Sequence, residues 1–430
     1  MLIWGVSFGY AQDDESEHEG LWTTFSNTFD GYIENETGTR LQELDYITQI
    51  KNNFRLKYEN DLTDHIHLTL DAFVTYDAAY DVNQDLTFPD DDEYRTDFQL
   101  REALLGFSFD KFDLLAGRQQ VVWEVTDGLR VLDVVNPMDL RSFILKDFDL
   151  IRIPLWMVNF EYYFTFDYSL QALIIPDMSF TELAKPGSEW AFTPPSFPPG
   201  VQPILNPAKE PVATPENTKY GVRFKGLYGG WDFTLNYLYT WANLPVQKST
   251  LEPTTGTLTI SPEYERLHLV GGSVVNVLWD TVFRAELASS IGQYYSVDDP
   301  TVPDMVVKKN TLSYVIALER DLFGISWLAQ GSQNVILDYD DEIRDNKADT
   351  ILTLRGSKSL NDEETFELIV VGMYRLPDDD YLIRPSVEYD MTDSWRLTSG
   401  VDIFGGGDDH TFLGQFDKKD RLYAEIRYSF

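Results

Sequence analysis

The chain has 430 residues and a formal net charge of −37, with 71 acidic side chains against 34 basic ones. This balance excludes nucleic-acid binding through a basic surface, and the lack of Cys excludes disulfides, thiolate nucleophiles and Cys-ligated metals. No run approaches the ~18 apolar residues that a membrane helix needs. Aromatic residues make up 14%, which suits a barrel with one lipid-facing side; a soluble secreted all-β protein is the alternative.

The amino terminus has the pattern of the end of a secretory signal. A short apolar stretch leads to Gly9-Tyr10-Ala11, a small-x-small cleavage pattern, and an acidic segment follows. We therefore expect residues 1–11 to be a signal-peptide remnant and residues 12–430 to form a single outer-membrane β-barrel domain.

From about Trp22 the chain repeats amphipathic hairpins. In residues 50–58 and 66–76, apolar and polar side chains alternate, as expected for strands with one apolar face. Tight turns are predicted at 62–64, 110–111, 167–168, 228–230, 279–280, 321–323, 362–363 and 392–393. Long connections are predicted near residues 37–45, 81–96, 124–147, 179–217, 242–263, 297–308, 338–349, 376–380 and 405–419.

Strict alternation of short turns and long loops is typical of a transmembrane antiparallel outer-membrane β-barrel with long external loops. Counting hairpins predicts an all-β fold of about 18 strands, with 16 as the fallback, and both termini in the periplasm. A propeller is disfavoured because no blade motif repeats. Outward-facing aromatics towards both ends of a strand, as in residues 231–239, indicate interfacial girdles rather than a sandwich core.

Residues 117–154 are far more apolar than a free external loop should be. We expect this loop to fold into the lumen and narrow it, and Asn136-Pro137 favours a turn there. Residues predicted to form a pore constriction or to contact solute are Arg118, Trp123, Asp127, Arg130, Asp133, Asn136, Asp139, Arg141, Asp149 and Arg152. Alternatively, their Arg–Asp pairs only pin the loop to the wall.

Here the sequence resembles a little-characterised family of bacterial outer-membrane channel proteins. The matching positions are Gly117-Arg118-Gln119, Asp127-Gly128, Asp133, Asn136, Pro137, Asp139, Leu140 and Arg141. The family usually shows Trp-Gly where this chain has Trp123-Glu124. The resemblance covers about a tenth of the chain and implies a barrel linked to export or uptake, without a defined substrate.

Residues 179–217 contain nine prolines. Such a segment is expected to form neither a regular strand nor a helix; it is interpreted as an exposed loop or a lid over the mouth.

Basic side chains are predicted along the lumen wall, where they either orient solutes or only pair with acids. The predicted wall residues are Arg55, Arg223, Arg266, Arg284, Arg384, Arg396 and Arg427.

The last ten residues, 421–430, alternate an apolar and a charged face and end on Phe430. This strand resembles the terminal strand of bacterial outer-membrane barrels, whose final Phe is part of the signal read by the barrel-assembly machinery. The resemblance implies location in the outer membrane of a Gram-negative bacterium, with outer-membrane lipid and lipopolysaccharide as surroundings. A homo-oligomer or an export-system partner is compatible with the sequence.

These features predict a porin-like channel, or the outer-membrane part of a transport system, that passes small polar or amphipathic solutes through a loop-constricted pore. A barrel sheath around a partner protein is the alternative. An outer-membrane hydrolase is a second, less favoured alternative, because His268 near Ser273 and the Asp408-Asp409-His410 cluster match no active-site motif. His65 and His67 alone make a poor metal site. No catalytic residue, metal or cofactor is predicted.

Overall fold

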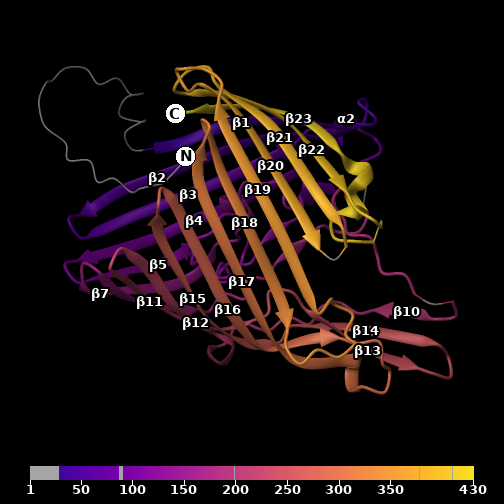
Figure 1. The fold of residues 1–430 in the computed structure, drawn as a ribbon. Coiled ribbons are helices and arrows are strands. Elements are labelled where there is room, and N and C mark those ends of the chain that lie inside the picture. The colour runs from indigo at the N-terminus through magenta and orange to yellow at the C-terminus, as the bar shows by residue number, and fades with distance from the viewer. Residues whose placement is uncertain (1–28, 87–90, 198, 377, 409) are drawn as a thin grey trace, which may run out of the picture.

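The computed structural model describes residues 29–86, 91–197, 199–376, 378–408 and 410–430, and these residues form a closed β-barrel (Figure 1). Eighteen strands belong to one sheet. The last strand, β23 (Arg421–Ser429), pairs antiparallel with the first, β1 (Phe29–Arg40), which closes the ring. The predicted fold class and the count of 18 strands are confirmed, whereas the fallback of 16 is wrong. The predicted leader, residues 1–11, lies outside the described residues.

The other barrel strands follow one another around the ring in chain order, each antiparallel to its neighbours. They are β2 (Ile47–Thr63), β3 (Ile66–Asp77), β4 (Thr96–Phe109), β5 (Phe112–Gln119), β7 (Leu155–Thr165), β8 (Tyr168–Ile175), β11 (Lys219–Tyr228), β12 (Trp231–Trp241), β15 (Arg266–Leu278), β16 (Thr281–Ser296), β17 (Val306–Leu322), β18 (Ile325–Ile336), β19 (Ala348–Ser359), β20 (Phe366–Leu376), β21 (Asp380–Asp390) and β22 (Trp395–Gly405). This order satisfies the backbone hydrogen bonds of every wall strand on both edges.

Short helices lie only in the connections of the described chain. They are α2 (Ala79–Val82), α3 (Asp91–Arg95), α4 (Phe148–Ile151) and the 3-10 turns η1 (Pro215–Asn217), η2 (Pro303–Met305) and η3 (Gly414–Lys419). Within the described ranges, no helix has the length and apolar character to cross a membrane.

The turn pattern matches the expected hairpins, with one exception. Strand β20 ends at Leu376 and β21 begins at Asp380, so this connection is short although it lies at the end of the barrel that carries the long loops. The prediction of a strict alternation between short and long connections is therefore wrong at this hairpin.

A small sheet extends beyond the loop end of the barrel (Figure 1). Strands β13 (Val246–Glu252) and β14 (Thr257–Glu263) form a hairpin, and β10 (Gln202–Leu205) adds to β14 in parallel. A second pair joins β6 (Asp139–Leu140) to β9 (Glu182–Leu183). The expectation that residues 179–217 hold no regular strand is wrong, because Pro203 occupies β10, an edge strand that tolerates a missing N–H.

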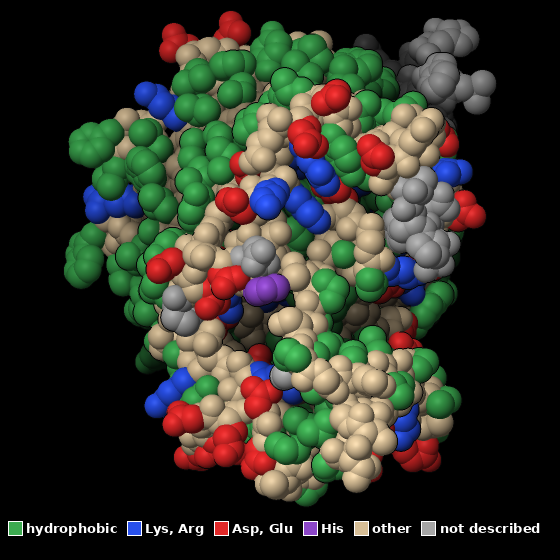
Figure 2. Space-filling view, turned by 90° about the vertical axis from the view of Figure 1, so that its right-hand side faces the viewer, with side chains coloured by type: hydrophobic (Ala, Val, Ile, Leu, Met, Phe, Trp, Pro, Cys, Tyr) green, Lys and Arg blue, Asp and Glu red, His purple; other side chains and the backbone are tan. Residues whose placement is uncertain are grey.

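Wall strands have one exposed apolar face and one buried face. On β12, Leu235 and Tyr237 are exposed, whereas Asn236 and Leu238 are buried. Since strand side chains alternate between the two faces, the exposed residues face outward and the buried ones face the lumen. Figure 2 views the loop end: hydrophobic side chains gather on the flanking wall, and acidic ones are scattered over the loops around a central hollow.

The closing register offers a direct test, because Thr37 on β1 lies opposite Ala424 on β23 and the chain has no native Cys. Opposed strand residues lie about 5.5 Å apart, within disulfide reach. The double variant Thr37→Cys/Ala424→Cys should therefore form an intramolecular disulfide on oxidation, seen as faster electrophoretic migration of the denatured, unreduced chain. The control pair Thr37→Cys/Ser399→Cys places the second cysteine one strand farther, on β22, and should not cross-link.

Candidate functional site

The inserted loop, residues 120–154 between β5 and β7, folds into the barrel as predicted. Its apolar side chains meet the inner wall of strands β7, β8, β12, β15, β16 and β17 in one buried cluster. The cluster comprises Val121, Trp123, Leu129, Val131, Leu132 and Val135 of the loop, with Leu155, Met157, Leu173, Ile175, Leu238, Leu267, Leu269, Ala288 and Val315 of the wall. Burial of each large side chain contributes about 1.5–3 kcal/mol, so this face of the loop is a true core.

Two wall glycines make room for the inserted loop. A Cβ added at Gly221 would lie 3.0 Å from the Trp123 ring, and one at Gly271 would lie 2.6 Å from Leu132. The loop therefore approaches the wall closely enough that the smallest residue is required opposite Leu132. The Trp123 indole N–H donates to Gln171 on β8 at 2.8 Å, which satisfies its only polar atom.

Glu286 on β16 anchors the loop by its carboxylate. One oxygen accepts the backbone N–H groups of Val125 and Thr126 at 2.5 and 3.0 Å, and the other accepts that of Leu132 at 3.0 Å. The Thr126 hydroxyl adds a fourth donor at 3.1 Å. Since loop N–H groups inside a barrel lack ladder partners, this one side chain satisfies three of them.

The opposite side of the loop is held by the wall near β4. The buried Arg101 guanidinium donates to the carbonyls of Asp149, Leu150 and Arg152, the last at 2.8 Å. Arg55 on β2 binds the Asp149 carboxylate at 2.7 Å and also the buried Asp71. The loop is thus attached to β16 on one side and to β2 and β4 on the other, so it crosses the lumen.

Ion pairs also fix the loop to itself. Arg130 and Arg152 both contact the buried Asp133 carboxylate, at 2.9 and 2.8 Å. Arg141 and Lys146 contact Asp139 at 2.9 and 2.6 Å. Although burial alone would raise it, these two cations hold the pKa of Asp139 well below its usual range.

Glu124 lies in the first of these charge groups and contacts Arg152. Burial, and then the nearby Asp133 carboxylate, raise the pKa of Glu124 to about 8, against the opposing effect of Arg152. With this pKa the Glu124 carboxyl is mainly protonated at neutral pH and loses its proton around pH 8.

Apart from Arg118, the predicted constriction residues fall into three sets. Trp123, Asp133, Asn136 and Asp139 are buried, so in this conformation they shape the loop. The side chains of Asp127 and Asp149 are 70% and 50% exposed. Arg130, Arg141 and Arg152 are engaged in the ion pairs described above. Contact with a passing solute stays a prediction for all of them.

Arg118 does not belong to the constriction. It lies opposite Trp156 in the register of β5 and β7, and Trp156 is exposed on the outer surface. The adjacent Gln119 takes the inward position instead, where it accepts a hydrogen bond from Asn159. The prediction for Arg118 is wrong because inward and outward positions in this strand are one residue out of phase with the assumed alternation.

Arg266 is also misplaced by the sequence interpretation. Its neighbours Leu267 and Leu269 are odd-numbered and pack inward, whereas its guanidinium lies over the outer rings of Tyr239 and Trp241, at 4.6 and 4.2 Å. The other predicted wall residues have lumen-facing contacts. Those contacts are Arg55–Asp71, Arg223–Val122, Arg284–Glu319, Arg384–Asp402, Arg396–Asp390 and Arg427–Glu34.

The histidines of the hydrolase alternative, among the described residues, do not form an active site with a nearby nucleophile. His268 contacts the Tyr237 hydroxyl at 2.8 Å on the outer face, whereas Ser273 is buried against Thr234 on the inner face. His65 and His67 contact a backbone carbonyl and Asp61, respectively. In the described part of the chain, no group of three potential metal ligands occurs.

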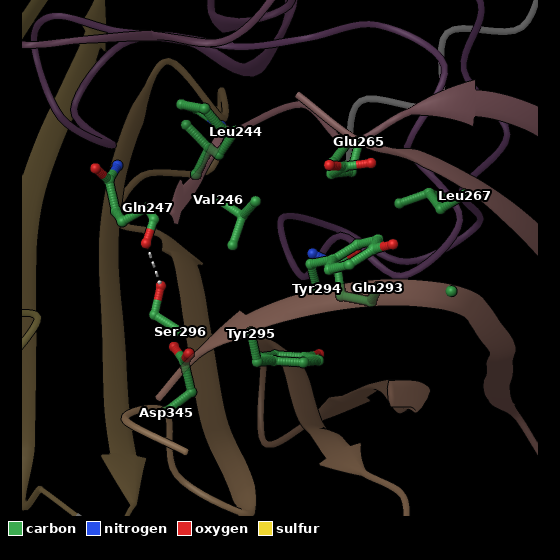
Figure 3. A pocket seen from close by; sticks show the side chains of 13 residues that line it. Leu244, Val246, Gln247, Glu265, Leu267, Gln293, Tyr294, Tyr295, Ser296 and Asp345 are labelled. Carbon is green, nitrogen blue, oxygen red and sulfur yellow. Dashed lines mark hydrogen bonds between the residues drawn. The ribbon is translucent and has the colours of Figure 1, made fainter. Parts of the chain in front are cut away.

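A pocket of about 260 Å³ lies at the loop end of the barrel, above the inserted loop (Figure 3). Two carboxylates, Glu265 and Asp345, line it together with Tyr295. The Ser296 hydroxyl donates to the Gln247 carbonyl at 3.3 Å across its edge. Because Leu267 lines this pocket and also packs on the inserted loop, the pocket borders the blocked part of the lumen.

Arg101 is the main anchor that sequence reasoning missed. The register between β3 and β4 shifts at Asp71/Ala72, so alternation counted back from Phe109 puts Arg101 on the outer face, whereas alternation counted from Thr96 puts it on the inner face. The three backbone partners of Glu286 come from residues about 160 positions earlier in the chain, a relation that no local pattern shows.

Comparison with known sequence families identifies residues 26–315 as matching the family described as a protein of unknown function (DUF1302). The chain belongs to this family. A comparison with curated proteins found no match. The predicted relation to a little-characterised family is supported at the level of family and fold, while the motif-level resemblance stays a prediction.

Solved outer-membrane proteins share the fold of this DUF1302 protein. It is similar to OpdK of Pseudomonas aeruginosa, solved with vanillate, with a TM-score of 0.51 and 9% identity over 94% of this chain and 98% of that one. OccAB3 of Acinetobacter baumannii gives a TM-score of 0.53 and 8% identity over the same shares. OccK2 (OpdF) of P. aeruginosa, in complex with glucuronate, gives 0.51 and 9% over 94% and 97%. These likenesses establish the barrel fold.

Replacing the anchor carboxylate should loosen the loop. In Glu286→Gln an amide N–H₂ replaces one acceptor oxygen, so backbone donors of the loop lose a charged partner, each such bond contributing about 1.5–3 kcal/mol. We expect limited proteolysis of the refolded barrel to cut within residues 120–154 several-fold faster than in the wild type. Glu388→Gln, which removes a wall carboxylate whose one ion-pair partner in the described chain is Arg396, should leave the cleavage rate unchanged.

The raised pKa of Glu124 predicts how the free energy of unfolding changes with pH. Its folded pKa, about 8, exceeds the ordinary value near 4.5, so the folded state binds more protons than the unfolded state between these values. The free energy of unfolding should therefore fall as pH rises from about 5 to 8 and level off above. The urea concentration at the unfolding midpoint should fall less between pH 6 and pH 8.5 for Glu124→Gln than for the wild type. An equal fall in both proteins would contradict the raised pKa of Glu124.

Proposed function

We propose that this protein is an outer-membrane porin-like channel of a Gram-negative bacterium, in which the inserted loop sets what passes. The observation that carries the proposal is the closed 18-stranded barrel crossed by a wall-anchored loop. A barrel of this size encloses more space than wall side chains fill. Its solutes are small polar or amphipathic molecules, and passage is passive.

The fold of the neighbours supports a location in the outer membrane, since OpdK of P. aeruginosa is an outer-membrane protein. Two neighbours were solved with small organic molecules, vanillate and glucuronate, which supports passage of solutes of that size. In this proposal, Phe430 in the terminal position is read by the barrel-assembly machinery, and lipid and lipopolysaccharide surround the wall.

A sheath around a partner protein is less well supported. The inserted loop occupies the middle of the lumen and is held at both walls, where a sheathed polypeptide would have to lie. Phe143 and Trp190 add a second buried cluster with Phe404 and Phe416 of the wall and the last loop.

Planar-bilayer conductance of the refolded protein in a salt gradient tests the proposal. We expect discrete steps of small amplitude in the wild type and a reversal potential that reports the charge selectivity. Deleting residues 128–145 removes the part of the loop that crosses the lumen and should raise the step conductance several-fold.

Glu388→Gln, which leaves the loop intact, serves as the control and should conduct like the wild type. Equal conductance of the wild type and the deletion variant, both inserted normally, would contradict a loop-set pore.

A further inference from the structure

A second cavity, of about 450 Å³, lies inside the barrel on the short-turn side of the inserted loop. Strands β7, β8, β11, β12 and β15 form its wall, and Val125 of the loop lies over it. Its lining includes Glu161, Ser169, Arg223, Lys225 and Ser273. The volume falls within the ~300–1,000 Å³ of small-molecule sites, so the cavity has room for more than an ion and a few waters.

Arg223 is an exception among the lumen arginines predicted from sequence. Its Nη1 donates to the Val122 carbonyl of the loop at 3.0 Å, but its buried Nε has no hydrogen-bond partner within the described structure. Among the described residues it also has no carboxylate partner, unlike Arg55 or Arg284. The Nε–Nη2 edge of a guanidinium is suited to receive the two oxygens of a carboxylate.

Asn236, the residue opposite Arg223 in the β-ladder, also has buried polar atoms without hydrogen-bond partners in the described structure. Asn236 on β12 lies opposite Arg223 in register and is 3% exposed. Neither its amide nitrogen nor its amide oxygen has a partner in the described chain. Buried polar atoms without partners are rare in folded proteins and mark places where a water or ligand completes the hydrogen bonds.

Hydroxyl groups line the cavity one row closer to the short turns. Ser169, Lys225, Thr234 and Ser273 lie side by side across four strands. Lys225 is already paired with Glu161 at 2.7 Å, so it adds no net charge. The cavity therefore offers Arg223 without an ion-pair partner among the described residues, a row of hydroxyls, and the carboxylates Asp167 and Asp232 towards the short turns, with Val125 as an apolar cover. Asn236 lies opposite Arg223 in the ladder but is not one of the lining residues.

We propose that this cavity binds a small hydroxylated organic acid, with Arg223 holding its carboxylate and the hydroxyl row binding its hydroxyl groups. Arg223 can take one carboxylate, the lining carboxylates Asp167 and Asp232 disfavour a second acid group, and the polar lining favours hydroxyl groups over an apolar ring. This assignment rests on the proposed channel function for the route by which the solute reaches the cavity. In this proposal, the cavity on the short-turn side of the inserted loop is the site that selects among solutes.

Isothermal titration calorimetry of the refolded full-length barrel in detergent micelles tests the site, with sodium gluconate as the probe and glucose as its neutral counterpart. We expect saturable gluconate binding and at least tenfold weaker glucose binding. Arg223→Gln leaves a shorter, uncharged polar side chain and should weaken gluconate binding at least tenfold. Asn236→Asp supplies an internal carboxylate to Arg223 and should weaken it similarly.

Arg355→Gln is the matched control. Arg355 on β19 donates to Ser357 at 3.3 Å, has no carboxylate partner among the described residues, and does not line this cavity; its loss should change gluconate affinity less than twofold. The proposed site would be wrong if both Arg223→Gln and Asn236→Asp bound gluconate with wild-type affinity. It would also be wrong if a wild-type barrel that conducts normally bound no gluconate. Either result would leave the proposed channel function unaffected. Gluconate binding by a barrel that does not conduct would instead overturn the channel function.

Discussion

The structure depends on the requirement that every backbone N–H and C=O within a lipid bilayer has a partner in the protein. A β-sheet meets this requirement only when its first and last strands pair, and here β23 pairs with β1 from Tyr32 to Arg40. With 18 strands the closed ring is too wide for wall side chains to fill it. Closure therefore creates a lumen whose contents must come from the loops.

The inserted loop fills that lumen in two physically different ways. On the side of β7 to β17 it packs apolar residues into a dry cluster, centred on the fully buried Trp123 and Leu132. On the side of β2 and β4 it is held by charge, through Arg101 and Arg55. A loop fixed only by the apolar cluster would be free to tilt at its far edge, whereas contacts on both walls hold it across the lumen.

Two cavities of different character border this loop. The one at the loop end is bordered by the carboxylates Glu265 and Asp345, and the one towards the short turns contains the unpaired Arg223. In the proposed channel, a solute would meet acidic groups, then the loop, and then a cavity that holds both cations and carboxylates. The proton exchanged at Glu124 lies inside the loop that both cavities border, so loop stability and pH are linked.

The sequence by itself determined the fold class, the number of strands, the positions of most turns and the insertion of residues 120–154, because two-residue alternation and an apolar segment among polar loops are local patterns. It misassigned Arg118 and Arg266, since a shift of one residue moves a side chain to the other face of the wall. Only the tertiary structure decided that Glu286 and Arg101 hold the loop and that Arg223 and Asn236 stay unpaired. Those relations join residues far apart in the chain, and register and packing, rather than spacing, bring them together.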